Sequence, residues 1–264
     1  VIPPFALLSM RLLLGLSVVI TILVIRRRRT GDPRLPSVRE LPALIGVGLV
    51  GFGISIGAQF VGTDLSTAIN GSLVTSASPA FIVLFAALIL RERLSWRRIA
   101  AVGLATVGVL VIIDLSKVSF SSQTFQGDVA LAVAAVTWGL YSVLVRLVSR
   151  DHDTLVVTAV AFTGGMFITI PGALIERNSR PVGEITPMIV LGVLYLGIVS
   201  TAGAMWLWNR AFALVDASVA SLFFFAQPVV GALLSVVLLN QQITPNLIIG
   251  SILIAAGVLL ALRK

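Results

Sequence analysis

Long runs of apolar residues, each about as long as a lipid bilayer is thick, follow one another along the whole chain. A helix needs ~20 such residues to cross ~30 Å of hydrocarbon at a rise of 1.5 Å per residue. Charged residues make up only 11% of the chain, whereas soluble domains contain roughly 25%. The runs also lack the alternation of apolar and polar residues that membrane strands show. The sequence therefore predicts an all-α integral membrane protein.

Only short polar segments separate these runs. Nine spans are predicted, at residues 5–25, 41–62, 67–90, 96–113, 129–147, 154–175, 188–208, 217–239 and 243–262. The net charge of +8 does not indicate nucleic acid as a partner, because the basic residues lie at the ends of the apolar runs. The chain has no Cys and one His, which excludes disulfides and thiolate metal sites. We expect no cofactor, no metal and no catalytic residue.

Two stretches of the sequence are similar to each other. Residues 65–113, laid over residues 214–262 without a gap at an offset of 149, are identical at thirteen of 49 positions. The matches include Pro79 with Pro228, and the run Gly-Val-Leu at 108–110 with the same run at 257–259. We interpret these matches as an internal repeat.

The two copies of one loop differ in charge. Residues 91–93 are Arg-Glu-Arg, whereas the aligned residues 240–242 are Asn-Gln-Gln. Cytoplasmic loops are enriched in Lys and Arg, so the two loops are predicted on opposite sides of the membrane. With the loop at 91–98 inside and the other connections alternating, 15 of the 19 Lys and Arg lie inside and 3 outside. The sequence thus predicts inverted repeats in the inner (plasma) membrane of the cell, with a cytoplasmic C-terminus.

Inverted halves need equal, odd numbers of spans. The second half has five and the first has four, so we expect a further helix, within about 25–30 residues, before residue 1. The chain would then hold nine transmembrane helices of a predicted ten, in two inverted five-helix repeats. The first repeat covers 1–113 and lacks its first helix, an external linker covers 114–128, and the second repeat covers 129–264.

Four stretches resemble one known family. They are SMRLLLGL at 9–16, SPAFIVLFAALILRERLSWRRIAAVGLATVGVLVI at 78–112, AVTWGLYSVLVRLV at 135–148 and QPVVGALLSVVLLNQQITPNLIIGSILIAAGVLLAL at 227–262. In this order they resemble the EamA family of the drug/metabolite transporter superfamily, over nearly the whole chain. No single motif is specific. The chain departs from the family in lacking the first helix, and in Gln241, which stands where a Glu is common.

The resemblance implies a secondary transporter, an exporter of small organic metabolites such as amino acids, that works by alternating access. Its partners would be a small-molecule substrate and the lipid bilayer, and the sequence leaves open whether it is a monomer or a homodimer. The alternatives are a channel-like facilitator and an integral membrane enzyme. Such enzymes use acidic clusters to hold Mg²⁺, and the nearest approach to one is Asp-His-Asp at 151–153.

Arg11 is a charge inside a predicted span. A charged residue there is costly, about 2.5–3.5 kcal/mol on insertion scales, so it usually faces the protein interior and has a partner. We predict that Arg11 binds an anionic group of the substrate or a partner in the expected further helix. The alternative is that its side chain extends to the outer headgroups.

One predicted helix carries a polar stripe. Ser72, Thr75, Ser76 and Pro79 share a face at spacings of three and four residues, and Asn70 lies near it. The second copy places Phe224, Gln227 and Pro228 in the same region. We predict that this stripe lines the substrate cavity and that the two prolines act as hinges. The alternatives are ordinary membrane packing and static bends.

Further binding candidates are polar and aromatic residues of other spans, of which Trp138 and Tyr141 lie deeper than Trp206, at the end of its span; Gln59 lines the pathway or only bonds across helices. Trp138 and Tyr141 share a helix face, whereas Trp208 fits an interfacial belt of aromatic residues. The remaining candidates are Trp206 and Gln59. The four arginines at 26–29 orient the chain, and contact with anionic lipid is a second interpretation of them.

Overall fold

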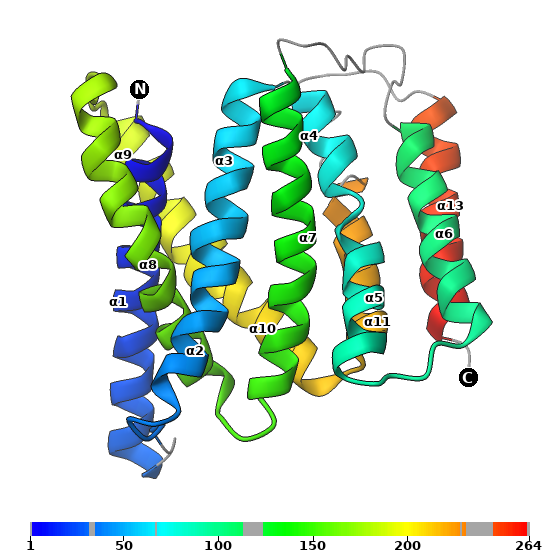
Figure 1. Ribbon diagram of the computed structural model, residues 1–264, viewed down its shortest axis with the longest axis horizontal. Coiled ribbons are helices and arrows are strands. Elements are labelled where there is room, and N and C mark those ends of the chain that lie inside the picture. The colour runs from blue at the N-terminus through cyan, green and yellow to red at the C-terminus, as the bar shows by residue number, and fades with distance from the viewer. Residues whose placement is uncertain are drawn as a thin grey trace. The chain divides into compact units, whose positions relative to one another are not determined.

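The computed structural model describes residues 2–31, 35–66, 68–112, 124–227, 229–230 and 245–262. Over these residues every regular element is a helix (Figure 1). The elements are α1 (Pro4–Thr30), α2 (Leu41–Gly48), η1 (Leu49–Ser55), α3 (Ile56–Leu65), α4 (Ala68–Thr75), α5 (Ser78–Ile89), α6 (Trp96–Ile112), α7 (Phe125–Val148), α8 (Thr154–Ser179), α9 (Pro187–Tyr195), η3 (Leu196–Gly203), α10 (Ala204–Leu214), α11 (Ala217–Ala220), η4 (Ser221–Phe225) and α13 (Pro245–Leu262).

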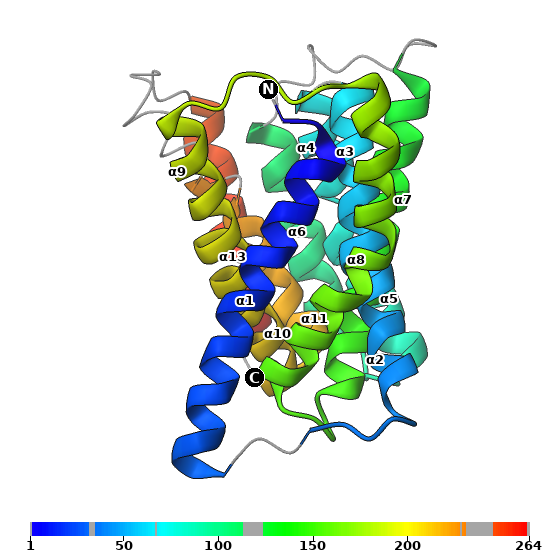
Figure 2. The same cartoon turned by 90° about the vertical axis from the view of Figure 1, so that its left-hand side faces the viewer.

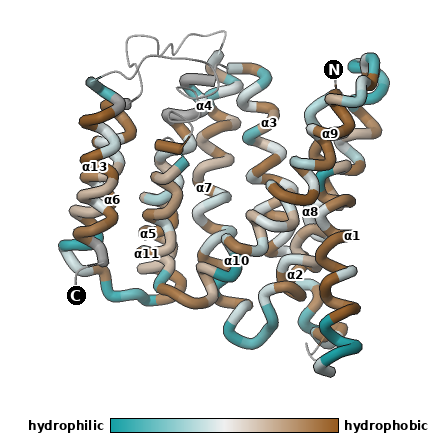
Figure 3. The backbone as a smooth tube through the Cα atoms, turned by 180° about the vertical axis from the view of Figure 1, so that it is seen from behind, coloured by the Kyte–Doolittle hydropathy of each residue, from teal (hydrophilic) through white to brown (hydrophobic). Residues whose placement is uncertain are grey.

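Five continuous helical stretches in the described part are long and apolar enough to cross a membrane. They are Pro4–Thr30, Leu41–Leu65, Phe125–Val148, Thr154–Ser179 and Pro187–Leu214. Apolar residues run along the helices, and hydrophilic residues gather at helix ends and connections (Figure 3). These observations confirm the all-α, membrane-type prediction. The last predicted hairpin is described only in part, because residues 231–244 with Gln241, and also Pro228, lie outside the described residues.

The predicted span at 67–90 is two helices, not one. α4 ends at Thr75, Ser76 and Ala77 form a turn, and α5 begins at Ser78. Pro79 lies in the first turn of α5. Proline is favoured there because its missing N–H would have no partner in that turn anyway, whereas inside a helix it removes a hydrogen bond. The described part of the corresponding later span is irregular too, since α11 tightens into the 3₁₀ turns of η4.

Two of the long helical stretches contain π-helical turns, in which a backbone hydrogen bond closes over five residues instead of four. These turns are η1, between α2 and α3, and η3, between α9 and α10. In η3 the Thr201 hydroxyl donates a hydrogen bond to the Leu196 carbonyl, at 2.7 Å. π-Helical turns occur frequently at functional sites, so polar side chains of both stretches are candidates for such a site.

The chain forms two compact units. The first consists of residues 1–61 and 140–214, and the second of residues 62–139 and 215–264. Each unit takes helices from both of the predicted repeats.

In the first unit, α8 packs along α1 (Figure 2) and also against α2 and η1. Glycines permit the close approach of α2 to α8. A Cβ added to Gly48 would lie 2.0 Å from the Ala161 carbonyl oxygen, and one added to Gly164 would lie 2.3 Å from the Ile45 carbonyl oxygen. The hydrophobic effect does not drive helices together within lipid. Small residues promote their association instead, because they let helix backbones make van der Waals contact.

In the second unit, α6 and α13 are an antiparallel pair. They also meet backbone to backbone, since a Cβ on Gly108 would lie 2.7 Å from the Gly250 carbonyl oxygen. Buried apolar side chains of α5, η4 and both helices complete this core, with Ala101, Val109 and Phe225 almost fully buried.

The close contact at Gly48 predicts a stability difference between two substitutions in the same helix. Gly48→Ala should lower the free energy of unfolding by about 1–3 kcal/mol, because the new methyl group forces the two backbones apart. Gly46→Ala should leave stability equal or slightly higher, because nothing lies within 4 Å of a Cβ there and glycine is itself unfavourable in a helix. Denaturant unfolding of the purified protein in detergent measures both, and equal values would contradict this packing.

Candidate functional site

Arg11 lies within α1 and is half-buried in the first unit. Its Nε donates a hydrogen bond to Thr201 Oγ1 at 3.1 Å, and its guanidinium carbon lies 5.8 Å from the centre of the Phe60 ring. Its two terminal nitrogens donate to none of the described residues, and no described carboxylate lies within ion-pair distance. The guanidinium therefore keeps one edge available for another acceptor.

The partner of Arg11 lies in an irregular part of the fold. Thr201 belongs to the π-helical η3, and its hydroxyl donates a hydrogen bond to the Leu196 carbonyl. The Thr201 oxygen is then oriented to accept from Arg11. A guanidinium held through Nε presents its remaining N–H groups as a fork, which matches a carboxylate or phosphate bidentately. The arrangement can therefore bind an anionic group.

Tyr141 belongs to a buried chain of hydrogen bonds in the same unit. Its hydroxyl donates to Asn209 Oδ1 at 2.8 Å, and Asn209 Nδ2 donates to Thr158 Oγ1 at 2.9 Å. All three side chains are fully buried. Such a network specifies how α7, α8 and α10 pack, because each polar group would be costly without its partner. Asn209 and Thr158 hold Tyr141 in the packing by these hydrogen bonds, and its contact with substrate stays a prediction.

Two other predicted residues lie in the first unit. Gln59 is exposed on α3, and Trp206 is half-buried on α10. Trp206 Nε1 is shielded from solvent and has no hydrogen-bond partner within the described part of the chain. A buried indole N–H normally finds an acceptor, so Trp206 is an available donor in the unit that contains Arg11.

The remaining predicted residues lie in the second unit. Thr75 donates to the Gly71 carbonyl at 2.6 Å, Ser76 is buried in the turn between α4 and α5, and Trp138 is half-buried on α7. Phe224 is half-buried on η4 and Gln227 is exposed after it. The side chains of Ser72 and Pro228 lie outside the described residues. The predicted roles of these residues in binding, and of Pro79 and Pro228 as hinges, stay predictions.

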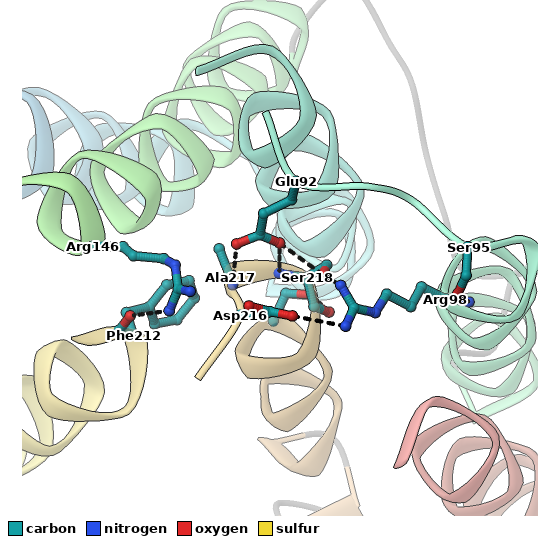
Figure 4. A network of polar contacts seen from close by, with 9 residues as sticks. Glu92, Ser95, Arg98, Arg146, Phe212, Asp216, Ala217 and Ser218 are labelled. Carbon is teal, nitrogen blue, oxygen red and sulfur yellow. Dashed lines mark hydrogen bonds and ion pairs between the residues drawn. The ribbon is translucent and has the colours of Figure 1, made fainter. Parts of the chain in front are cut away.

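A charged network surrounds the start of α11 (Figure 4). Glu92 accepts hydrogen bonds from the backbone N–H groups of Ala217 and Ser218, at 2.8 and 3.3 Å, and from the Ser218 hydroxyl at 2.9 Å. Arg98 forms an ion pair with Asp216 at 2.7 Å and donates to the Ser218 hydroxyl at 3.1 Å. The first N–H groups of a helix have no partner within it and attract negative charge. Glu92 thereby binds the α5–α6 connection to the start of α11, and Arg98 binds the first turn of α6 to it.

The turn that presents Glu92 has an unusual backbone. Arg91 adopts a φ of +54°, and the Glu92 N–H donates to the Ala86 carbonyl at 3.1 Å. A residue in the left-handed region followed by this bond is the common way to end a helix, although glycine is preferred at that position. The arrangement turns the chain at the end of α5 so that Glu92 reaches α11.

A second carboxylate is bound near the start of α4. Asp128 on α7 accepts hydrogen bonds from Ser66 Oγ at 2.6 Å, Asn70 Nδ2 at 3.0 Å and Thr124 Oγ1 at 3.1 Å. The predicted binding residue Asn70 is fully buried and directed at this carboxylate. α4 begins at the end of the second unit where α7 begins, whereas α11 begins at the opposite end, beside the α5–α6 connection (Figure 1).

Glu92, Arg98, Asp216 and Asp128 were not among the binding candidates predicted from the sequence. The three acids share one signal, which is an acidic residue at the end of a span. Asp216 stands directly before a helix start, and Glu92 is the one acid among four arginines, of which Arg98 is one. The sequence could not pair them, because their partners lie up to 126 positions away. Within the described residues, no group of three or more metal-ligating side chains comes together.

Comparisons with known proteins identify a family and several similar proteins. The chain matches the EamA-like transporter family over residues 1–114 and 125–263. An uncharacterized transporter from Archaeoglobus fulgidus is 31% identical over 87% of this chain and 78% of its own length. The uncharacterized transporter YoaV from Bacillus subtilis is 25% identical over 97% of this chain and 86% of its own length. One crystal structure, 26% identical, covers all of this chain and 90% of its own, with a TM-score of 0.84.

The Glu92 network predicts a loss of stability on substitution. Glu92→Ala should lower the free energy of unfolding by roughly 1–3 kcal/mol, because two backbone N–H groups at a helix start lose a charged acceptor. Glu184→Ala, which removes an exposed carboxylate, should change it by less than about 0.5 kcal/mol. Thermal unfolding in detergent compares the two variants, and a similar effect of both would show that the network adds nothing to stability.

Proposed function

Because the chain belongs to the EamA-like transporter family, we propose that it is a secondary transporter for small organic metabolites that carry an anionic group, amino acids or similar compounds. It exports them by alternating access. The observation that carries the proposal is Arg11, whose terminal nitrogens lack a described partner on a membrane-length helix and whose Nε is fixed by Thr201. A charge at such a position marks a substrate pathway in membrane proteins.

The reciprocal contact of α6 with α13 supports two inverted halves. Gly108 packs against Gly250, and Gly257 packs against Ala101. The sequence offset of 149 converts the first pair into the second, since 108 becomes 257 and 101 becomes 250. Two like elements related by a two-fold axis make contacts of this self-complementary kind. The two helices are antiparallel, as copies inserted in opposite orientations would be.

The positions of the two π-helical turns are also related by the offset of 149. The offset carries residues 49–55 of η1 onto 198–204, which overlaps η3 at 196–203. Transporters built from inverted repeats hold substrate near the bilayer midplane, on interrupted helices that occupy corresponding positions in the two halves. Thr201, the residue that orients Arg11, belongs to one of these two interruptions.

The two bound carboxylates are consistent with a carrier that closes first at one end and then at the other. Glu92 holds the start of α11 and Asp128 holds the start of α4. These helices begin at Ala217 and Ala68, which the offset relates. We propose that the hydrogen bonds of each carboxylate hold one end of the second unit closed. During transport the two sets of bonds would break one after the other. The excess of basic residues at one set of connections orients the chain in the inner (plasma) membrane, with the C-terminus in the cytoplasm.

Substitution of Arg11 tests the substrate site. In proteoliposomes assayed with a panel of radiolabelled amino acids and other metabolites, Arg11→Gln should weaken transport of the best anionic substrate by about 10–100-fold, the value of a charged hydrogen bond. Arg11→Lys should retain part of the activity, because the charge stays and the fork is lost. Arg177→Gln removes an exposed arginine at the end of α8 and serves as the control. Unchanged transport by Arg11→Gln would exclude Arg11 from the site.

Labelling of introduced cysteines tests the inverted repeats. Since the chain has no Cys, Ser95→Cys and Thr244→Cys each provide one unique thiol at positions that the offset relates. An impermeant maleimide added to intact cells should label only the variant at 244, and addition to inside-out vesicles should label only the variant at 95. Labelling of both variants from one side would contradict the inverted arrangement and leave the assignment of Arg11 standing.

A further inference from the structure

An apolar groove of about 470 Å³ lies on the first unit, between α1 and α8. α1 contributes Leu16, Ile20 and Leu23, and α8 contributes Val156 and Val160. The segment at 35–41 lines the groove as well. Arg27 and Thr163 are the only polar residues of the described lining. A volume of this size is typical of a site for a small molecule.

The groove has a charged end and a long apolar part. Its lining on α1 runs from Leu16 to Arg27, which are eleven positions apart, or roughly 16 Å at a rise of 1.5 Å per residue. One leaflet provides half of the ~30 Å of hydrocarbon in a bilayer, so the apolar part matches the depth of one leaflet. Arg27 then lies where the headgroups begin, in the run of four arginines at 26–29.

The charges at this end are unequally satisfied. Arg26 forms an ion pair with Asp153 at 2.9 Å, and Asp153 also accepts from the Leu155 N–H at the start of α8. These bonds join the ends of α1 and α8. Arg27 is exposed, its guanidinium contacts no described carboxylate, and it is the arginine of the run that lines the groove. A net positive charge therefore remains at the mouth of the groove.

We propose that this groove is a binding site for an anionic glycerophospholipid of the surrounding bilayer. Its acyl chain lies between α1 and α8, and its phosphate meets Arg27. The match of the apolar length to one leaflet argues for an acyl chain, and a guanidinium that pairs with no carboxylate in the described part of the chain argues for a negatively charged headgroup. The site is separate from Arg11, and the proposal does not depend on which substrate the protein transports.

Native mass spectrometry of the purified, delipidated chain tests the headgroup contact, with phosphatidylglycerol or phosphatidylcholine added back. One phosphatidylglycerol per chain should survive at collision energies that remove phosphatidylcholine. Arg27→Gln should reduce this preference about fivefold, the effect of one arginine near an anionic surface. Arg28→Gln removes the neighbouring exposed arginine, which does not line the groove, and should leave the preference unchanged.

The contact with the acyl chain is tested by introducing phenylalanine at two positions of α8, one inside the groove and one outside it. Thr163→Phe fills the groove at an exposed position, where it does not disturb the core, and should weaken binding of both lipids. Ile170→Phe, exposed and outside the lining on the same helix, should have no effect. Equal retention of the two lipids, equal effects of Arg27→Gln and Arg28→Gln, or undiminished binding by Thr163→Phe would each overturn the proposal. So would disulfide-linked dimers of a Thr163→Cys variant, which would show that a second copy covers the groove.

Discussion

Hydrocarbon offers no hydrogen bonds, so every polar group inside the bilayer must find its partner within the chain. Backbone groups find theirs by forming helices, and only the helix ends remain incomplete. In this protein three of the described carboxylates accept hydrogen bonds at or near the starts of helices. Glu176 accepts from the Phe5 N–H at the start of α1, Glu92 binds the start of α11, and Asp128 binds the residues around the start of α4. The acidic residues at the span ends thus organise the packing of helices that are distant in sequence.

The same constraint explains why the helices approach so closely. Lipid tails are as apolar as leucine, so burying apolar area between helices gains little, and dense packing must hold them together. Glycines at Gly48, Gly164 and Gly108 allow backbone-to-backbone contact that any side chain would prevent. Buried polar chains such as Tyr141–Asn209–Thr158 then fix one arrangement among the many that an apolar interface would tolerate.

Arg11 differs from these groups, because its terminal nitrogens donate to none of the described residues. It is a charge on a membrane-length helix whose described contacts are a hydroxyl and an aromatic ring. The helix that supplies the hydroxyl is irregular at that point, and irregular backbone at membrane depth is tolerated where it is buried in protein or lines a cavity. Together these features make the surroundings of Arg11 the strongest candidate for a substrate site. At the other end of α1, Arg27 meets the bilayer instead, at the mouth of a groove suited to lipid.

The sequence by itself determined the helical membrane class and the starts of most spans, because hydropathy and charge act locally along the chain. Four stretches of the sequence also pointed to the family by resemblance. It also picked out Arg11, since a charge in an apolar run is conspicuous. It did not reveal the break at Ser76–Ala77, the π-helical turns, or the pairing of Glu92 with Ala217, 125 positions away. Only the structure showed these features, and the pairing of Glu92 depends on which helix ends meet in space. Two helix ends that meet can exchange a carboxylate and an N–H whatever their separation in sequence, and no local pattern encodes that encounter.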